Sequence, residues 1–317
     1  MKIAIIGAGL SGCNVYLNLK KQNHDIVVFE KSRGIGGRLS TKYIDDKFID
    51  HGTPFINTKD YKFPNFLDFL DKKVTQNILR NIDKKYYPTN GINKLCSSLI
   101  NKKDLITNTR ITNAILINQK WTLTDNTNTI YDDFDFVVFT IPATQILEND
   151  FNLDEDTKKQ LESVSYAPMA SLICYTNIKN TKKLKNQELL KSQLFYKVVD
   201  NSTKYDYENF ESYVFHLNKD FVFSNKDLEK NELFEIIHQE ISKEFDINLK
   251  EDFNVVEHFW KFAFAKEKID KDFILNKEKS YGICGDYFKG INLEASYQSS
   301  LKISDEINSI YKKDKKC

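Results

Sequence analysis

Apolar and polar positions alternate along this chain in ways that predict both strands and helices. Short, almost wholly apolar runs at Lys2–Ile6, Asp25–Phe29 and Asp135–Ile141 are typical of buried parallel strands. Helical patterns run from about residue 10 to residue 22 and from about Leu293 to Tyr311. The order strand, helix, strand predicts an N-terminal βαβ unit, and we expect the third apolar run to return to its sheet.

The segment that follows the βαβ unit has the pattern of hairpins and short helices. Thr41–Ile44 and Lys47–Ile49 flank Asp45-Asp46, which predicts a β-hairpin. We expect helices at Asn65–Lys73 and Ile92–Asn101. A β-meander is predicted from four further strands: Leu105–Thr109, Ile111–Asn118, Trp121–Asp125 and Thr129–Tyr131.

The character of the chain changes from Leu147 to about Phe273. A helix is predicted at Lys226–Phe245, together with strands at Ala170–Tyr175, Leu194–Val199, Tyr213–Leu217 and Phe253–Phe264. The polar, lysine-rich segment Lys179–Leu190 is interpreted as a surface loop. The whole pattern predicts an α/β fold, in which a Rossmann-type domain carries an inserted mixed-sheet α+β substrate domain. We assign residues 1–60, 92–145 and 274–317 to the first domain, and 61–91 and 146–273 to the second.

Composition excludes several classes of function. A net charge of +1 and a pI of about 7.5 do not favour nucleic acid or an anionic membrane as the main partner. The five cysteines never form Cys-x-x-Cys and the five histidines lack ligand spacing, so we expect neither a disulfide framework nor a metal site. No apolar run reaches the roughly 18 residues of a membrane span, and a strand begins almost at Met1. We therefore expect a cytoplasmic protein without a signal peptide.

The first turn carries the strongest candidate chemistry. Gly7-Ala8-Gly9-Leu10-Ser11-Gly12 follows the first strand and opens the first helix, and Glu30 ends the second strand. In this context Gly7 permits a tight turn, Gly9 lets the backbone approach a pyrophosphate, and Gly12 lets the helix pack closely. Phosphates would meet the unpaired N–H groups of the helix, and Glu30 would accept hydrogen bonds from a ribose. The alternative is a set of glycines that only make a turn.

A second glycine-rich turn distinguishes a flavin site from a plain nicotinamide site. Lys31-Ser-Arg33-Gly-Ile-Gly-Gly37-Arg38 comes directly after the acid and holds two of the four arginines in the chain. Arginine binds phosphate through two parallel hydrogen bonds, so its enrichment here indicates a pyrophosphate contact. The alternative is a solvated basic loop.

The C-terminal part has the same order of elements as the first turn, with a strand followed by a glycine-containing turn and a helix. A strand near Lys279–Cys284 ends in Gly285-Asp286, and a helix begins after Asn292. Asp286 could bind polyol hydroxyl groups, while the positive end of the helix would stabilise negative charge. The alternative for Asp286 is a simple cap of a helix or turn.

Six segments in this order resemble the renalase family, a branch of the FAD-dependent amine-oxidase superfamily. They are Ile3–Gly12, Glu30–Arg38, Phe48-Ile-Asp-His51-Gly52, Phe134–Pro142, His258-Phe-Trp260-Lys-Phe-Ala263 and Cys284–Asp286. Family members usually carry arginine where this chain has Phe259 and Lys261.

The resemblance implies a two-domain fold like that of p-hydroxybenzoate hydroxylase, with non-covalent FAD. It also implies an oxidase that takes hydride from dihydro-NAD(P) isomers reduced at a ring carbon other than C4, with O2 reduced to H2O2. The alternatives are an amine oxidase or desaturase acting on a small amine, and a non-catalytic flavoprotein. The cofactor-binding residues predicted are Gly7, Ala8, Gly9, Leu10, Ser11, Gly12, Glu30, Lys31, Arg33, Gly37, Arg38, His51, Gly52, Ile111, Pro142, Gly285, Asp286, Ile291 and Asn292.

The substrate pocket is predicted from an aromatic strand. Trp260 and Phe262 are two residues apart and so lie on one face of the strand, with His258 two residues before Trp260. These aromatic residues could line a pocket or simply fill a core. His51 could reach the flavin, or it could only form a hydrogen bond within a turn. Lys261 could bind a phosphate group of the substrate, or it could be solvated. A dihydropyridine is already a hydride donor, so we expect no tuned general base.

Overall fold

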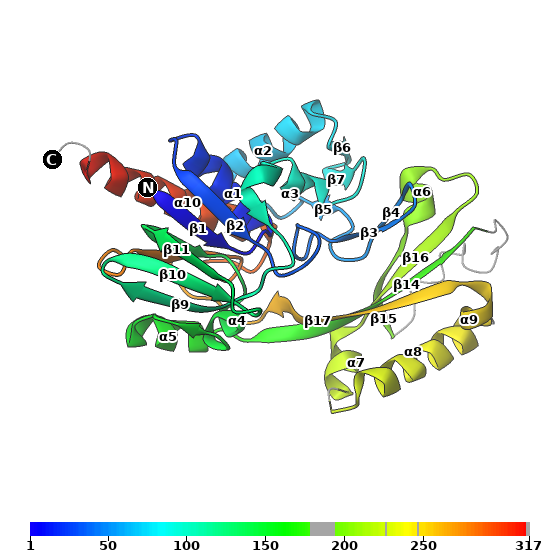
Figure 1. The fold of residues 1–317 in the computed structure, drawn as a ribbon. Helices are drawn as coiled ribbons and strands as arrows, with labels where there is room; N and C mark the ends of the chain where they lie inside the picture. The colour runs from blue at the N-terminus through cyan, green and yellow to red at the C-terminus, as the bar shows by residue number, and fades with distance from the viewer. Residues whose placement is uncertain (178–193, 226, 246, 315–317) are drawn as a thin grey trace.

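The computed structural model describes residues 1–177, 194–225, 227–245 and 247–314 (Figure 1). The predicted surface loop at Lys179–Leu190 lies outside these residues. The fold has two lobes side by side, one built around the N-terminal strands and one around a long pair of strands at the other end of the molecule.

A six-stranded sheet forms the centre of the first lobe. Its order is β18 (Ile274–Asn276), β19 (Tyr281–Ile283), β12 (Phe136–Phe139), β1 (Lys2–Ile6), β2 (Asp25–Phe29) and β8 (Leu105–Ile106). All neighbours are parallel except β18 and β19. Both the predicted βαβ unit and the return of the 135–141 run to its sheet are confirmed.

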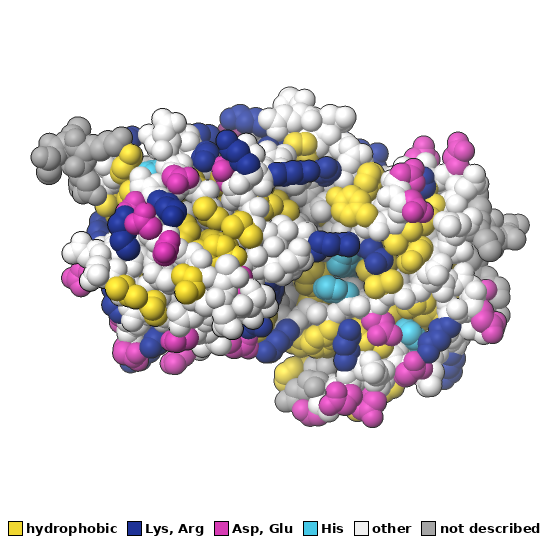
Figure 2. Space-filling view, viewed as in Figure 1, with side chains coloured by type: hydrophobic (Ala, Val, Ile, Leu, Met, Phe, Trp, Pro, Cys, Tyr) yellow, Lys and Arg dark blue, Asp and Glu magenta, His cyan; other side chains and the backbone are white. Residues whose placement is uncertain are grey.

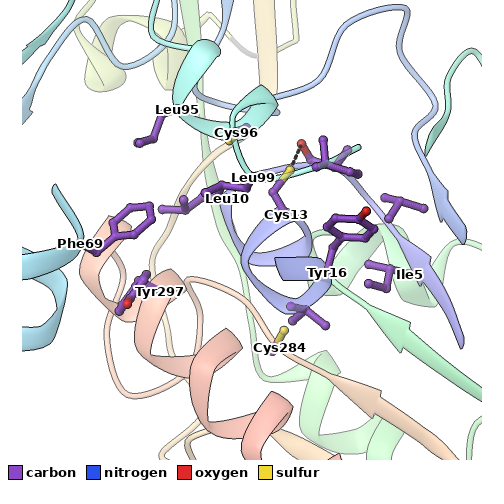
Figure 3. Packing of buried hydrophobic residues seen from close by; sticks show 14 of the residues in the cluster. Ile5, Leu10, Cys13, Tyr16, Phe69, Leu95, Cys96, Leu99, Cys284 and Tyr297 are labelled. Carbon is purple, nitrogen blue, oxygen red and sulfur yellow. Dashed lines mark hydrogen bonds between the residues drawn. The ribbon is translucent and has the colours of Figure 1, made fainter. Parts of the chain in front are cut away.

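One face of this sheet is covered by helices α1 (Leu10–Lys20) and α10 (Leu293–Asp314), which pack against each other. Figure 3 shows the buried side chains around α1, among them Cys13, Tyr16 and Tyr297. Polar bonds also join the two helices, because the Asn14 amide donates to Ser300 Oγ at 2.8 Å. The last helix therefore packs as part of the first lobe.

The opposite face of the central sheet is covered by a mixed sheet and two helices. The sheet has the order β11 (Ile130–Phe134), β10 (Lys120–Asp125), β9 (Ile111–Ile117) and β13 (Asp150–Phe151), and the helices are α4 (Ala143–Leu147) and α5 (Glu155–Glu162). This sheet is antiparallel except for the parallel pair β9 and β13. The predicted meander is correct for three of its strands. The prediction that Leu105–Thr109 belongs to this meander is wrong, because residues 105–106 form the edge of the parallel sheet beside β2.

The second lobe is a four-stranded sheet with helices on one face. The strand order is β15 (Phe195–Asp200), β16 (Glu211–Leu217), β14 (Tyr166–Thr176) and β17 (Asn254–Ala265), and every neighbouring pair is antiparallel. Ala170, Leu172 and Cys174 of β14 pack with the apolar face of α8 (Lys230–Phe245). The alternate residues Ser171 and Ile173 point to the other face, where Ile173 packs with Ile49 of the first lobe. Helices α7 (Lys219–Ser224) and α9 (Leu249–Asp252) flank α8.

A small connecting region joins the lobes. It contains the hairpin β3 (Thr41–Ile44) and β4 (Lys47–Asp50), as predicted, and a three-stranded sheet of β5 (Ile56–Asn57), β7 (Lys85–Pro88) and β6 (Leu79–Ile82). A further helix, α6 (Asn201–Tyr205), contacts β4 from the second lobe. The buried pair of Asp50 and Lys204 links the two, and Asp50 Oδ1 also accepts from the Ile92 N–H at 2.8 Å.

Two sequence predictions differ from the structure here. Residues 61–91 were placed in the substrate domain, but Phe66, Phe69 and Leu79 of α2 (Pro64–Thr75) and β6 pack into the core around α1. Residues 146–165 likewise pack with the central sheet. The helix expected at Ile92–Asn101 is only α3 (Lys94–Ser97), because Ser97 and Ser98 hydroxyls donate to carbonyls three residues back and compete with helical bonds.

Candidate functional site

The first glycine turn has the close geometry that a dinucleotide site needs. Gly7 has φ +106° and its N–H donates to the Phe29 carbonyl at 2.8 Å, which ties the turn to β2. A Cβ on Gly12 would lie 2.0 Å from the Gly7 carbonyl oxygen. A Cβ on Gly9 would meet nothing closer than 3.9 Å. The turn is thus packed on its inner side and open beside Gly9, at the N-terminus of α1, where phosphate would be placed.

Glu30 lies at the end of β2 with both carboxylate oxygens held. Oε2 accepts from the Ala8 N–H and Oε1 from the Ser32 N–H, each at 2.9 Å. Glu30 is buried, and its carboxylate joins the first glycine turn to the start of the second. Each oxygen keeps a second lone pair, so the group could also accept from a hydroxyl group.

The two glycine turns are hydrogen-bonded to each other. The Gly36 N–H donates to the Ala8 carbonyl at 2.9 Å, and Gly9 and Gly36 form an isolated parallel bridge. Gly36 has φ +121°, and a Cβ there would lie 2.2 Å from the Leu39 carbonyl oxygen. The second turn therefore lies directly against the first, as its proposed role requires.

Arg38 joins the N-terminal turns to the C-terminal motif. Its Nη1 donates to Asp286 Oδ2 at 2.7 Å and its Nη2 to Asp286 Oδ1 at 2.6 Å. Nη1 also donates to the Ala263 carbonyl at 3.2 Å. Residues 248 positions apart are thereby paired, and we call Gly7–Gly12, Gly34–Arg38 and Asp286 the glycine site.

The other predicted cofactor residues are distributed around this site. Asn292 caps α10, since its Oδ1 accepts from the Ala295 N–H at 2.8 Å. The Gly285 N–H donates to Ser299 Oγ at 3.3 Å, and Gly52 packs so tightly that a Cβ would lie 2.1 Å from the Arg38 carbonyl oxygen. The remaining predicted side chains differ in exposure: Ile111 is buried, Pro142 is half-buried, and Lys31, Arg33 and Ile291 are exposed.

His51, His258 and Trp260 come together as one cluster. The ring of His51 lies 4.9 Å from that of His258 and 5.6 Å from that of Trp260, and the rings of His258 and Trp260 are 4.2 Å apart. Ser40 Oγ and His51 Nε2 share a hydrogen bond of 2.9 Å. His51 Nδ1 and Trp260 Nε1 are buried and have no hydrogen-bond partner among the described residues. We call these three residues the histidine–tryptophan cluster.

The cluster continues as a row of polar residues across the second sheet. Ser171 pairs in register with His258 on one side and with His216 on the other, and His216 pairs in turn with Lys197. Directly paired residues share a face of an antiparallel sheet. Ser171 Oγ and His216 Nδ1 share a hydrogen bond of 3.1 Å, whereas the buried His216 Nε2 has no partner among the described residues.

The histidines of this face are neutral, and the charged groups that lower their pKa values are lysines, one of which, Lys204, is paired with Asp50. Burial lowers the pKa of His51 to about 3, and the neighbouring His258, His216 and Lys42 lower it further. Burial, followed by Lys197 and Lys204, lowers the pKa of His216 to about 3. The pKa of His258 is also lowered, by burial and by Lys230. Figure 2 shows histidine side chains between the two lobes, with hydrophobic and Lys or Arg side chains around them.

Lys261 does not join the cluster. It follows Trp260 on β17 and so points to the other face of the strand, where its Nζ forms an exposed ion pair with Glu148 at 2.8 Å. Sequence reasoning missed Lys197 and His216 as residues of the site. Their placement depends on the pairing of β15, β16 and β14, which no local pattern reveals.

Two further classes of site find no support in the residues that the structure describes. None of the helices described is long and apolar enough to cross a membrane. Within the same residues, no group of three or more His, Cys, Asp or Glu side chains is arranged to hold a metal ion.

Comparisons with known proteins agree with the fold. Residues 5–72 match the family model of an NAD(P)-binding Rossmann-like domain. A 4,4'-diapophytoene desaturase of Staphylococcus aureus is 35% identical over 60 residues, which make up 19% of this chain. That match spans only 12% of the length of the desaturase.

Solved structures match over nearly the whole chain. Cyclohexylamine oxidase from Brevibacterium oxydans has a TM-score of 0.66 at 10% identity, covering 98% of this chain and 99% of that one. Putrescine oxidase bound to putrescine has a TM-score of 0.64 at 9% identity, with 98% and 99% covered. A fatty acid isomerase from P. acnes has a TM-score of 0.61 at 11% identity, with 97% and 98% covered. At such low identity these likenesses establish the two-lobed Rossmann-type fold, which enzymes of different chemistry share.

Proposed function

We propose that this protein is an FAD-dependent oxidase whose hydride donor is a dihydronicotinamide, specifically an isomer of dihydro-NAD(P) reduced at a carbon other than C4. The observation that carries this proposal is the character of the substrate face. The rings of His51, His258 and Trp260 form a neutral aromatic cluster, in which the His51 and Trp260 planes are inclined at 31° and the His258 ring meets them at 63° and 58°. The charged groups that lower the pKa values of the histidines on this face are lysines. A planar donor bearing phosphate groups fits such a face.

The glycine site supports FAD as the cofactor of this proposal, because it offers hydrogen-bond donors beside an open stretch of backbone. The side of the turn beside Gly9 is open, and the free N–H groups of α1 begin there. Glu30 would hold the adenosine ribose, and Arg38 and Asp286 would hold the pyrophosphate and the polyol chain. When bound, FAD supplies the acceptor for the hydride and the route by which electrons reach O2 to give H2O2.

The residues of the chain would contribute positioning rather than proton transfer. His51 and His258 stay neutral at physiological pH because burial lowers the pKa of each. Trp260 offers a ring face against which a nicotinamide can stack, and its buried Nε1, like His51 Nδ1, has no hydrogen-bond partner among the described residues. These two nitrogens could bind a carboxamide, which has both a donor and an acceptor. Holding a donor in one orientation supplies much of what a hydride transfer requires.

An amine substrate is the second candidate, because putrescine oxidase and cyclohexylamine oxidase share the fold. Aliphatic amines are largely cationic near neutral pH. The lysines around the histidines would repel such a cation, and no carboxylate forms an ion pair with His51, His216 or His258 in the described part of the chain. Charge therefore favours the anionic donor.

An anaerobic titration tests the proposal. The FAD-loaded protein would be mixed separately with C4-reduced NADH, with its isomers reduced at other ring carbons, with putrescine and with cyclohexylamine, while the loss of flavin absorbance is followed. We expect the isomers to bleach the flavin much faster than the other donors and to release NAD(P)+. Oxygen added afterwards should restore the flavin and form H2O2.

A matched pair of variants connects the result to the cluster. Trp260→Leu removes the stacking surface and should slow bleaching by the isomers by roughly a hundredfold, as expected for a lost positioning contact. Phe264→Leu alters an exposed aromatic residue on the same strand and should leave the rate unchanged. Faster bleaching by the amines than by any dihydronicotinamide would overturn the proposal in favour of an amine oxidase. A flavoprotein that none of these donors reduces would overturn both.

A further inference from the structure

A pair of lysines marks the far end of the polar row that begins at His258. Lys197 of β15 pairs in register with His216, which is two strands from His258 in the sheet. Adjacent strands are about 4.8 Å apart, so the row from His258 to Lys197 spans roughly 14 Å. All four residues of the row, including Ser171, lie on one face.

A second lysine, Lys85 at the start of β7, reaches the same place from the connecting region. Lys197 Nζ lies 4.5 Å from the centre of the Phe55 ring, and Lys85 Nζ lies 5.7 Å from the same centre. Phe55 stacks in turn on Tyr87, with ring centres 5.2 Å apart. Two ammonium groups, one from the second lobe and one from the connecting region, thus lie near a single aromatic ring, and all four side chains are half-buried.

Within the described part of the chain, these two charges lack a partner of opposite sign. Neither Lys85 nor Lys197 forms an ion pair with an acid in the residues that the structure describes. Burial lowers the pKa of Lys197, and the charge of Lys85 lowers it further, so the two ammonium groups destabilise each other. Like charges held together at a partly desolvated position are stabilised when an anion binds between them.

The next residue in the row adds a neutral polar group. His216 is only 2% exposed, its Nδ1 is bonded to Ser171, and its Nε2 has no partner among the described residues. A buried polar atom without a partner is uncommon in folded proteins and is satisfied when a ligand supplies the bond. His216 therefore lies, buried, between the lysine pair and the histidine–tryptophan cluster.

We infer that Lys85 and Lys197 form a subsite for a phosphate or pyrophosphate group of the hydride donor. This inference rests on the proposed function, because it identifies the part of the donor that lies away from the reacting ring. The donor would place its nicotinamide against the histidine–tryptophan cluster and its pyrophosphate between the two lysines. A small amine could not reach both ends of a row that spans roughly 14 Å. Lys261, which the sequence offered for this role, is instead paired with Glu148.

The first test measures the binding of an anion alone, without any hydride transfer. Inorganic pyrophosphate would be titrated calorimetrically into the FAD-loaded protein, in which the glycine site is already filled. We expect binding to the native protein, about tenfold weaker binding to each of Lys85→Ala and Lys197→Ala, and no measurable binding to the double variant. Lys250→Ala is the matched control, since it removes one charge from the helical side of the second sheet, where Lys250 pairs with the exposed Glu235.

Donors of different length then test the role of the subsite. With a dihydronicotinamide mononucleotide isomer, the double variant should show at least a tenfold higher apparent dissociation constant and an unchanged limiting rate of flavin reduction. With the corresponding riboside, which lacks phosphate, native and variant proteins should behave alike. Lys197→Gln keeps most of the length of the side chain without its charge and should match Lys197→Ala, because the effect is one of charge.

The outcomes separate this inference from the proposed function. Equal pyrophosphate affinity in the native, double-variant and Lys250→Ala proteins would overturn the subsite, whatever the donor proves to be. Pyrophosphate binding that depends on the lysines, combined with no reduction by any dihydronicotinamide, would overturn the proposed function and leave an anion site. An equal loss with the mononucleotide and the riboside would show that the variants disturb the fold, and would also count against the subsite.

Discussion

Acid is expected to destabilise this protein through His51 and His216, which are 7% and 2% exposed. Burial is the main cause that lowers the pKa of each to about 3. In the unfolded chain a histidine has a pKa of about 6.5. Between these two values the unfolded state binds more protons than the folded state. The free energy of unfolding therefore falls as the pH is lowered from about 6.5 toward 3.

The magnitude follows from the difference in pKa. One pH unit within this window corresponds to about 1.36 kcal/mol for each proton taken up on unfolding. Between pH 7 and pH 5, each histidine should lower the free energy of unfolding by about 2 kcal/mol. The two together should lower it by about 4 kcal/mol, a large share of the 5–15 kcal/mol that is typical of folded domains.

Urea unfolding at pH 7, 6 and 5 measures this effect. His51→Gln keeps a polar atom near the position of Nε2, the atom that is hydrogen-bonded to Ser40. His216→Asn keeps a polar atom near the position of Nδ1, the atom that is hydrogen-bonded to Ser171. The double variant should lose most of the pH dependence between pH 7 and pH 5, while carboxylates titrate alike in both proteins. A native protein whose stability falls no more steeply than that of the double variant would refute the assignment of two buried neutral histidines.

Three further predictions each rest on one contact. Gly12→Ala places a Cβ 2.0 Å from the Gly7 carbonyl oxygen and should cost about 1–3 kcal/mol and most of the bound flavin, whereas Gly34→Ala, with nothing within 4 Å, should retain both. Arg38→Lys loses the paired bonds to Asp286 and should weaken flavin retention roughly tenfold, while the same change at the exposed Arg33 should not; flavin absorbance per polypeptide after desalting measures both effects. Lys204→Met leaves the Asp50 carboxylate buried without its cation and should cost about 3–5 kcal/mol in urea unfolding, against less than about 1 kcal/mol for Lys277→Ala at the exposed pair with Glu306. Equal flavin content within either pair of flavin-site variants, or equal unfolding free energies for the two lysine variants, would contradict these arguments.

The glycine site was predictable from sequence because its signals are local. The turn requires glycine at Gly7, the close contact between helix and turn requires glycine at Gly12, and the end of the second strand requires an acceptor such as Glu30. The pairing of Arg38 with Asp286 was predictable for a second reason. Both follow strands of one parallel sheet, and the carboxyl ends of such strands meet at one edge.

The face that carries the histidine–tryptophan cluster was only partly predictable, because it depends on pairing between distant segments. His258 and Trp260 could be placed on one face of a strand by their spacing. Lys197, His216 and Ser171 meet that face only through the registers of β14, β15 and β16, and these registers leave no mark in local composition.

The domain boundaries were misplaced for a related reason. The apolar face of α2 has the same spacing whether it packs on the first lobe or on the second. Only the structure shows Phe66 and Phe69 against Tyr297 of α10, with ring centres 5.0 and 4.9 Å apart. The length of α3 was overestimated for another reason. Buried apolar residues continue on both sides of the four helical ones, so the apolar pattern is longer than the helix.

Strand β17 determines how the two sites are placed relative to each other. It extends from Asn254 to Ala265, carries His258 and Trp260, and offers the Ala263 carbonyl to Arg38. Its pairing with β14 is regular as far as Trp260 and shifts register before Phe264, so an irregularity of the ladder lies between Trp260 and the residues that face Arg38. A slip of one residue in its pairing with β14 would turn His258 and Trp260 to the helical face. The geometry of the proposed hydride transfer therefore depends on the register of one β-ladder.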